Sequence, residues 1–279
     1  MSSRRSVAYF ALLATFAVSA CSGDDSAGPA TDAPTTLSPA TEAPTTVSLD
    51  PAVEAMMYTE AGPYPVGVTT LELAAGNKVE VWYPAVEGTT GAEFYDTRDF
   101  VPPAIKALLT ADVPARYDYT AGRDAVVADG QFPIVLFSHG YSGIRLQSTF
   151  LTAHLASWGM IVAAPDHWSR DLFHVLSAPV GDRESATGEL LGTLDLVTSG
   201  DDDPASLLQG HVDVSRVIAL GHSAGGGTIV SAANDDRIDG YISMASGVLG
   251  MGSANATITA PSTFVNKPSF FIAGALDAI

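Results

Sequence analysis

The chain has 279 residues, of which 47% are hydrophobic, and its 31 acidic and 13 basic residues give a formal net charge of −18 at pH 7. So acidic a chain is repelled by nucleic acid and by anionic lipid surfaces, which excludes both as expected partners. Its one cysteine, Cys21, excludes an intramolecular disulfide, so the fold must be stabilised by its hydrophobic core.

Residues 1–20 have the pattern of a lipoprotein signal peptide. Two arginines precede an apolar run over residues 7–20, which is too short to span a bilayer comfortably. The residues VSAC, 18–21, resemble a bacterial lipobox, in which the cysteine is lipidated and becomes the mature N-terminus. We therefore expect an exported, cell-surface lipoprotein that is anchored to a bacterial membrane through Cys21.

A Thr/Pro-rich linker, residues 21–49, follows the signal. It contains a near-repeat, TDAPTTLSPA at 31–40 and TEAPTTVSLD at 41–50. Such a segment buries nothing, and its prolines favour an extended, disordered spacer. Residues 50–279 then form a block of the size of one domain.

In the first third of this domain, the sequence pattern predicts a β-hairpin followed by a less regular segment. Residues 68–73 and 78–83 alternate in period two, and Ala75-Gly76-Asn77 supplies the turn between them. A short helix is expected at 104–110, after two prolines. The whole segment 88–131 has two open interpretations, an insertion on the substrate side or a plain surface connection.

Beyond residue 131, apolar strands alternate with helices. The run FPIVLF at 132–137 is typical of a strand that is buried on both faces. This alternation indicates an α/β fold with a parallel sheet, whose ligands bind at the carboxyl ends of the strands. The further strands are expected at 160–164, 216–220, 241–245 and 269–273, and the helices at 150–158, 190–197 and 224–233.

The residues GHSAG, 221–225, lie where a strand gives way to a helix. In that context the G-x-S-x-G pattern predicts a nucleophile elbow, a sharp turn that exposes a serine. Ser223 is therefore expected to have a positive φ, and its neighbours Gly221 and Gly225 have no Cβ to obstruct so tight a turn. The chain has no G-x-G-x-x-G pattern with a later acidic residue and no G-K-[ST] pattern, which argues against a nucleotide-binding loop.

A second loop, HGYSG at 139–143, follows the strand at 132–137. Acyl transfer needs two backbone N–H groups that point to where the carbonyl oxygen becomes negative. Both loops lie at the carboxyl ends of parallel strands. We therefore expect the amides of Tyr141 and Ala224 to form the oxyanion hole.

Four segments in this order, FPIVLFSHGYSG, MIVAAPDH, RVIALGHSAGGG and FFIAGALDAI, resemble the α/β-hydrolase superfamily, and within it the platelet-activating-factor acetylhydrolase-like and cutinase-like polyester hydrolases. The resemblance covers about residues 64–279. It implies an α/β-hydrolase fold, with a mostly parallel central sheet and helices on both faces, and no cofactor. It also implies Ser223 as the nucleophile, Tyr141 and Ala224 as the oxyanion amides, and Asp277 as the acid that orients the base.

One position departs from the polyester hydrolases, which carry a substrate-stacking tryptophan after the strand that follows the elbow. This chain has Ala245-Ser246-Gly247-Val248 there. We therefore expect a serine carboxylic-ester hydrolase that acts through an acyl-enzyme on small or medium acyl esters, with lipid and polyester esters as alternatives. The rival hypothesis is a catalytically inactive surface lipoprotein that keeps the fold and binds a ligand. We expect a monomer in either case.

The six histidines do not indicate a metal centre. His139 is expected to make a structural hydrogen bond, His154 to lie on a helix face, and the side chain of His222 to point away from Ser223. No H-E-x-x-H pattern or tight ligand spacing is present, so no metal is expected. The candidate ligands would otherwise be His167, His174 and His211 with Asp166 or Asp171.

The triad of this superfamily runs Ser, acid, His along the chain. All six histidines precede Ser223, and only two residues follow Asp277. We therefore expect residues 50–279 to be a C-terminally truncated domain that lacks its last strand and helices together with the catalytic histidine. The chain of 279 residues should then be nearly inactive as it stands.

Overall fold

The structure is a computed structural model that describes residues 56–177, 185–246 and 264–274. The signal peptide, the linker with Cys21, and Asp277 lie outside these residues. The chain divides into two compact units, Met1–Glu60 and Ala61–Ile279, and the sheet and the candidate site belong to the second. No helix in the described residues is long and apolar enough to cross a bilayer.

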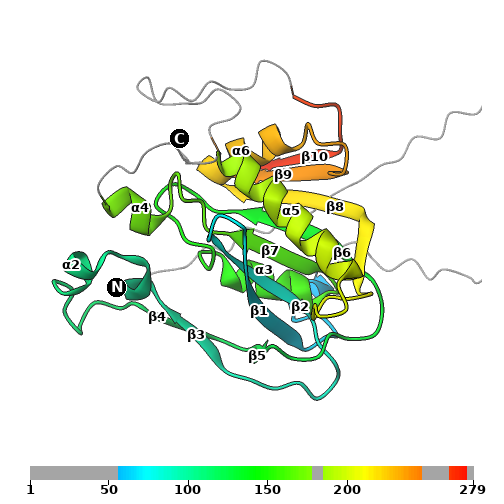
Figure 1. Ribbon diagram of the computed structural model, residues 1–279, viewed down its shortest axis with the longest axis horizontal. Coiled ribbons are helices and arrows are strands. Elements are labelled where there is room, and N and C mark those ends of the chain that lie inside the picture. Colours follow the sequence, from blue (N-terminus) through cyan, green and yellow to red (C-terminus); the bar gives the residue numbers. More distant parts are fainter. Residues whose placement is uncertain (1–55, 178–184, 247–263, 275–279) are drawn as a thin grey trace, which may run out of the picture. The chain divides into compact units, whose positions relative to one another are not determined.

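The second unit is built on a central sheet in the order β10-β9-β8-β6-β7-β2-β1-β5 (Figure 1). The strands from β10 to β7 pair in parallel, whereas β2 pairs antiparallel with both β7 and β1. Every strand predicted beyond residue 131 is present, and the predicted α/β class is confirmed. The strands are β1 (Val66–Glu72), β2 (Lys78–Pro84), β5 (Gly122–Arg123), β6 (Phe132–Ser138), β7 (Ile161–Pro165), β8 (Val212–His222), β9 (Gly240–Met244) and β10 (Ser269–Ile272).

The predicted hairpin is confirmed. β1 pairs with β2 in a register that runs from Val66 opposite Pro84 to Glu72 opposite Lys78. Gly76 in the connecting turn has a φ of +102°, a conformation that glycine adopts without strain. The hairpin thereby extends the parallel part of the sheet with antiparallel strands.

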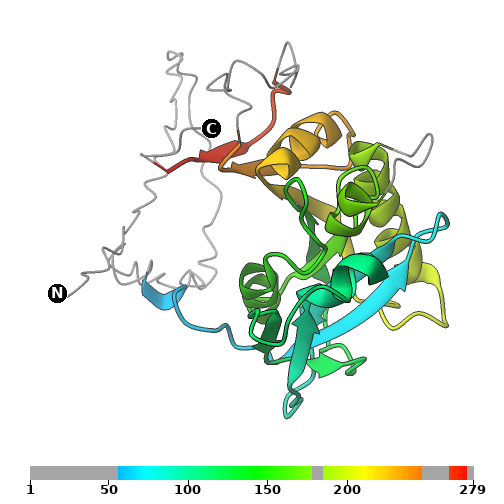
Figure 2. The same ribbon diagram turned by 90° about the vertical axis from the view of Figure 1, so that its left-hand side faces the viewer.

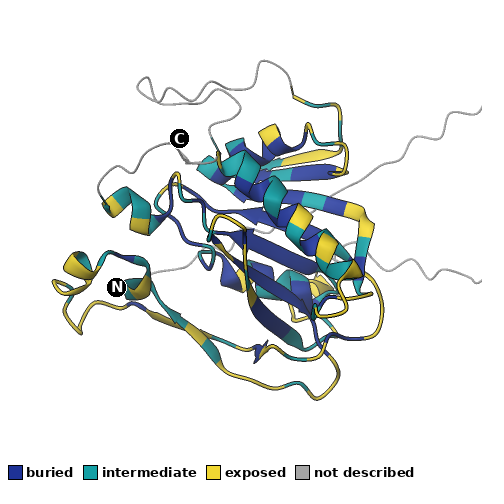
Figure 3. Ribbon diagram, in the orientation of Figure 1, coloured by how far each residue is buried: buried dark blue, intermediate teal, exposed yellow. Residues whose placement is uncertain are grey.

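Two hydrophobic cores lie on opposite faces of the sheet (Figure 3). Ile134 of β6 belongs to one core and Val135 to the other, because successive side chains of a strand point to opposite faces. The helices α5 (Ala186–Asp202) and α6 (Ala224–Ala232) cover the first face, and α3 (Thr149–Ser157) covers the second. Helices therefore lie on both faces, as predicted, and Figure 2 shows the sheet between them.

The segment 88–131 differs most from the prediction. The helix expected at 104–110 is shorter, because α2 spans only Pro103–Lys106 and buries no residue whose packing could extend it. β3 (Glu93–Asp96) and β4 (Arg116–Tyr119) pair into a separate two-stranded sheet that was not predicted, since four residues are too few for a period-two pattern to stand out. The remaining short helices are η1 (Thr97–Phe100, a 3₁₀ helix) and α4 (Leu172–Leu176).

Candidate active site

The turn between β8 and α6 has the geometry of a nucleophile elbow. Ser223 has φ of +54° and ψ of −121°, so the predicted positive φ is confirmed. A Cβ on Gly221 would lie 2.3 Å from the carbonyl oxygen of Gly225, and a Cβ on Gly225 would lie 2.0 Å from that of Ser138. Neither position accepts a side chain, because real Cβ atoms do not approach backbone oxygens so closely. The two glycines therefore permit the strained turn that presents Ser223.

The loop after β6 keeps one amide free. Gly140 N donates to Gln147 Oε1 at 3.2 Å, Ser142 N to the Arg170 carbonyl at 2.9 Å, and Gly143 N to the Gly140 carbonyl at 3.1 Å. Between them, Tyr141 N has no acceptor among the described residues. The loop thus satisfies the neighbouring amides and leaves the one that was predicted for the oxyanion hole.

The second predicted oxyanion amide, Ala224 N, is the first of α6 and also has no acceptor in the described part of the chain. The two loops lie against each other, since a Cβ on Gly140 would be 3.3 Å from Ser223 Cβ. The structure therefore brings Ser223 together with the loop that carries Tyr141.

A cavity of about 400 Å³ opens beside Ser223. The described residues that line it include no Asp, Glu, Lys or Arg, although the chain as a whole carries a formal charge of −18. One wall comes from the small sheet of β3 and β4, which supports the interpretation of 88–131 as an insertion on the substrate side. The lining residues are Tyr95, Thr97, Tyr117, Gly140, Tyr141, Ser142, Gly143, Ile144, Gln147, Leu172, His222 and Ser223.

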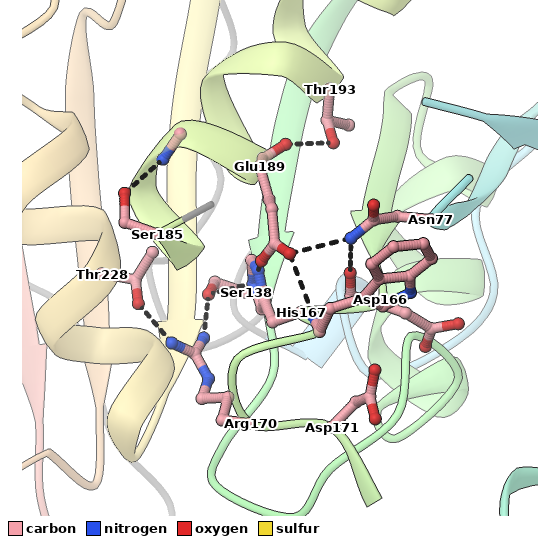
Figure 4. Close-up of polar contacts among 12 residues, drawn as sticks. Asn77, Ser138, Asp166, His167, Arg170, Asp171, Ser185, Glu189, Thr193 and Thr228 are labelled. Atoms are coloured by element: carbon pink, nitrogen blue, oxygen red, sulfur yellow. Dashed lines mark hydrogen bonds and ion pairs between the residues drawn. The ribbon is translucent and has the colours of Figure 1, made fainter. Parts of the chain in front are cut away.

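A buried polar network underlies the loop after β6 (Figure 4). His167 Nε2 lies 2.8 Å from Ser138 Oγ, and its Nδ1 lies 2.9 Å from Glu189 Oε2. Glu189 Oε1 accepts from Asn77 Nδ2 at 2.8 Å and from the Trp168 amide at 3.0 Å. The network joins β6, the loop after β7, helix α5 and the β1–β2 turn around the base of the site.

Arg170 connects this network to the helix of the elbow. Its Nη2 donates to Ser138 Oγ and its Nη1 donates to Thr228 Oγ1 on α6, both at 2.7 Å (Figure 4). Nη2 also donates to the carbonyl oxygen of His139 at 2.8 Å. Burial lowers the pKa of Arg170 to about 10, so the guanidinium stays charged at neutral pH. Since Ser138 Oγ accepts from Arg170, its own proton goes to His167 Nε2.

This assignment of the Ser138 proton determines the charge of His167. His167 must be neutral, with Nδ1–H donating to Glu189, and burial holds the pKa of His167 well below its usual range. Burial likewise raises the pKa of Glu189, while the hydrogen bond from Asn77 opposes that shift. Burial also lowers the pKa of His139, whose Nδ1 donates to the Gly140 carbonyl at 2.8 Å. The predicted structural hydrogen bond of His139 is confirmed.

The remaining histidines are held by other partners. His222 Nδ1 accepts a hydrogen bond from Gln147 Nε2 at 3.0 Å, and His222 also lines the cavity that contains Ser223. His174 Nδ1 lies 2.7 Å from the carboxylate of Asp171, and His154 lies on α3. Across the described ranges, no three of the His, Cys, Asp and Glu side chains are grouped as a metal site would require.

Ser223 has no histidine partner in this structure. All six histidines lie in described residues, and none makes a hydrogen bond to Ser223 Oγ. The predicted acid, Asp277, lies outside the described residues. Of the predicted triad, the structure therefore describes only the serine.

Comparisons with known proteins agree with this fold. The family model of platelet-activating factor acetylhydrolase, isoform II, matches residues 70–179. A platelet-activating factor acetylhydrolase of Cavia porcellus is 23% identical over 63% of this chain and 52% of its own length, so the chain spans about half of that relative. The structure of a ferulic acid esterase from Streptomyces cinnamoneus is similar with a TM-score of 0.51 and 22% identity, over 76% of this chain and 66% of that one. The chain therefore has the predicted α/β-hydrolase fold and is similar to ester hydrolases of that fold.

Proposed function

We propose that the chain is a serine carboxylic-ester hydrolase that works through an acyl-enzyme. Ser223 Oγ attacks the ester carbonyl, the tetrahedral intermediate expels the alcohol, and water then hydrolyses the acylated serine. The observation that carries this proposal is the strained elbow at Ser223 beside two backbone amides that have no acceptor among the described residues. A protein that only bound a ligand would have no need of such a serine.

The amides of Tyr141 and Ala224 would stabilise the negative oxygen of the intermediate. An oxyanion donor typically contributes about 3 kcal/mol to transition-state stabilisation. The amino end of α6 adds its positive dipole at the same place. The arrangement thus favours charge that develops on a carbonyl oxygen.

The proton of Ser223 has no base to receive it in the described structure. Loss of a triad member typically reduces the rate by about four to six powers of ten. We therefore infer that the 279-residue chain turns over slowly. Added imidazole should accelerate the reaction, because a small free base can enter the open cavity and accept the proton.

The substrate we propose is a neutral ester of a small or medium acyl group. The cavity is large enough for such a group, and its described lining has no Asp, Glu, Lys or Arg side chain with which to pair an ionic substrate. Lipid and polyester esters remain alternatives of the same reaction class.

A fluorophosphonate probe tests the proposal. We expect it to modify Ser223, as shown by peptide mass spectrometry, and imidazole to increase the rate of labelling. Ser223→Ala should abolish both the labelling and the hydrolysis of p-nitrophenyl butyrate. Ser215→Ala, at an exposed serine of the same strand, is the matched control and should change neither. Retained turnover in Ser223→Ala would contradict the assignment.

The second candidate is a ligand-binding protein of hydrolase fold. It is favoured by the absence of a histidine partner for Ser223 in the described residues. The two functions separate in the same experiment, because a pure binding protein should remain unlabelled at Ser223 even at high imidazole concentration.

A further inference from the structure

The small sheet beside the cavity presents a pair of stacked tyrosines. β3 and β4 pair antiparallel with Tyr95 directly opposite Tyr117. The two ring centroids are 5.1 Å apart and the ring planes differ by 17°. Both residues line the cavity that contains Ser223. The pair is therefore a flat aromatic wall of the candidate active site.

The opposite face of this small sheet has a different composition. Phe94 follows the alternation of a strand and lies on the other side from Tyr95, where the guanidinium of Arg116 is 3.6 Å from its ring centroid. Phe94 is absent from the cavity lining. Phe94 is therefore an aromatic residue of the same small sheet that lies away from the cavity, and it can serve as a control for Tyr95 and Tyr117.

The ring of Tyr117 is the accessible part of the tyrosine pair. Tyr117 is 50% exposed, whereas Tyr95 is partly buried. Burial, together with the neighbouring Tyr117, raises the pKa of Tyr95, so its ring remains neutral and carries no phenolate charge at neutral pH. A planar group that entered the cavity could extend the stack on Tyr117.

The rest of the lining limits what such a group can be. Among the described residues that line the cavity there is no Asp, Glu, Lys or Arg, so an ionic group would lose its water without gaining a partner from them. Thr97, Ser142 and Gln147 offer hydrogen bonds that suit a neutral polar substituent. Stacking and apolar contact therefore dominate recognition at this wall.

We propose that Tyr95 and Tyr117 form a ring-binding subsite that selects neutral esters with a planar aromatic ring a few bonds from the scissile carbonyl. The subsite rests on the proposed function, because Ser223 defines where that carbonyl lies. The aromatic ring lies against the tyrosine wall while the ester faces the elbow. The ring can belong to the acyl group or to the alcohol, and the two cases are separated by the probes below.

Matched fluorophosphonates test the subsite. One probe of each pair carries a 2-phenylethyl group and the other a 2-cyclohexylethyl group, attached through carbon to mimic the acyl side or through oxygen to mimic the alcohol side. In each reaction the Ser223 Oγ–P bond forms, the P–F bond breaks, fluoride leaves, and the serine proton passes to added imidazole. The rate of Ser223 modification is measured by intact-protein mass spectrometry.

We expect the phenyl probe to react about two- to tenfold faster than its cyclohexyl partner in at least one pair, because aromatic stacking adds to area burial by that factor. Tyr95→Leu and Tyr117→Leu should bring the ratio close to one. Tyr117→Phe keeps the ring and should keep the ratio, as should Phe94→Leu on the opposite face. The ratio is internal to each variant, so partial unfolding does not imitate the effect.

Equal rates for both pairs in the wild type, or a ratio that survives both leucine substitutions, would overturn the subsite while leaving the esterase proposal intact. A third probe with a 2-(trimethylammonio)ethyl group tests the alternative of cation recognition, and its fastest reaction would also overturn the subsite. If no probe labels Ser223, the esterase proposal fails. The subsite is then tested alone by NMR titration with 3-phenylpropan-1-ol and 3-cyclohexylpropan-1-ol, and equal affinities would refute it.

Discussion

The guanidinium of Arg170 donates to the hydroxyl of Thr228 on α6 at 2.7 Å, and the same guanidinium holds the carbonyl oxygen of His139 at 2.8 Å. His139 is the first residue of the loop that carries the predicted oxyanion amide of Tyr141. The buried side chain of Arg170 thereby joins this loop to helix α6. Arg170 is in this sense a positioning residue, because it is absent from the cavity lining.

Thr228→Val should remove the hydrogen bond through which Arg170 joins these two elements. The substitution leaves Arg170 Nη1 without its acceptor in a buried site, which should lower the free energy of unfolding by about 1–3 kcal/mol. We also expect a fluorophosphonate to modify Ser223 about tenfold more slowly. The fluorophosphonate concentration that gives the half-maximal rate should stay unchanged. Urea unfolding and labelling kinetics measure the two effects.

The matched control is Thr198→Val on α5, where the hydroxyl bonds only to carbonyl groups of its own helix. It should leave the labelling rate unchanged. Equal labelling rates in Thr228→Val and the wild type would contradict the positioning role.

Two glycines of α6 should respond in opposite ways to alanine. Gly225→Ala places a methyl group 2.0 Å from the carbonyl oxygen of Ser138, so we expect severe destabilisation and loss of Ser223 labelling. Gly227→Ala meets nothing within 4 Å and should stabilise the helix by about 0.5–1 kcal/mol. Thermal denaturation compares the variants, and a stable, reactive Gly225→Ala protein would refute the described packing of the elbow.

Acid should destabilise the fold through two buried histidines. Burial holds the pKa of His139 and of His167 well below the usual value near 6.5, so the unfolded chain takes up protons that the folded chain does not. Their contribution to stability is fully present above about pH 6.5 and is lost as the pH falls below it, at about 1.4 kcal/mol per pH unit for each histidine.

Urea unfolding between pH 7.5 and 5 measures this slope. His167→Gln should reduce it by the share of one histidine, whereas His211→Asn, at a surface ring, is the matched control. An identical slope in His167→Gln and the wild type would show that His167 does not remain neutral in the folded protein.

The lipobox at residues 18–21 leads to a prediction about location. In a bacterial host, a palmitate analogue should label the full chain, and Cys21→Ser should abolish the label and release the protein from membranes. Because Cys21 is the only cysteine, no other thiol can be acylated in its place. A wild-type protein that is unlabelled and found in the soluble fraction would disprove the lipid anchor.

The elbow could be predicted from the sequence because its determinants are local. Gly221, Ser223 and Gly225 lie within five residues, between a β-branched strand and a helix of small residues. The two amides could be placed for a similar reason, since parallel strands bring their carboxyl ends to one edge of a sheet. These parts depend only on chain direction and turn geometry.

The supporting network could not be read from periodicity. Arg170 and Thr228 are 58 positions apart, and their contact depends on the order of strands in the sheet. Glu189 carried only a weak signal, because on its helix face Thr193 is polar and Val197 alone is apolar, although the structure buries all three.

The aromatic wall of Tyr95 and Tyr117 could not be predicted from the sequence, for a different reason. Tyr95 and Tyr117 belong to strands of four residues each, and their pairing depends on a connection of about twenty residues with little regular structure. The sequence therefore left open whether 88–131 faced the substrate. Only the register of β3 against β4 places both rings on one side.

The pairing of Ser138 with Gly221 places the last rungs of β6 and β8 side by side. The spacing between the loop after β6 and the elbow is consequently set by one interstrand distance, about 4.8 Å, between two paired strands of the central sheet. The wall that faces the substrate comes from a different, smaller sheet. If the proposed function and subsite hold, the reacting groups and the groups that select the substrate belong to separate sheets. The segment from β3 to β4 could then be exchanged or redesigned to change substrate preference without altering the sheet that carries Ser223.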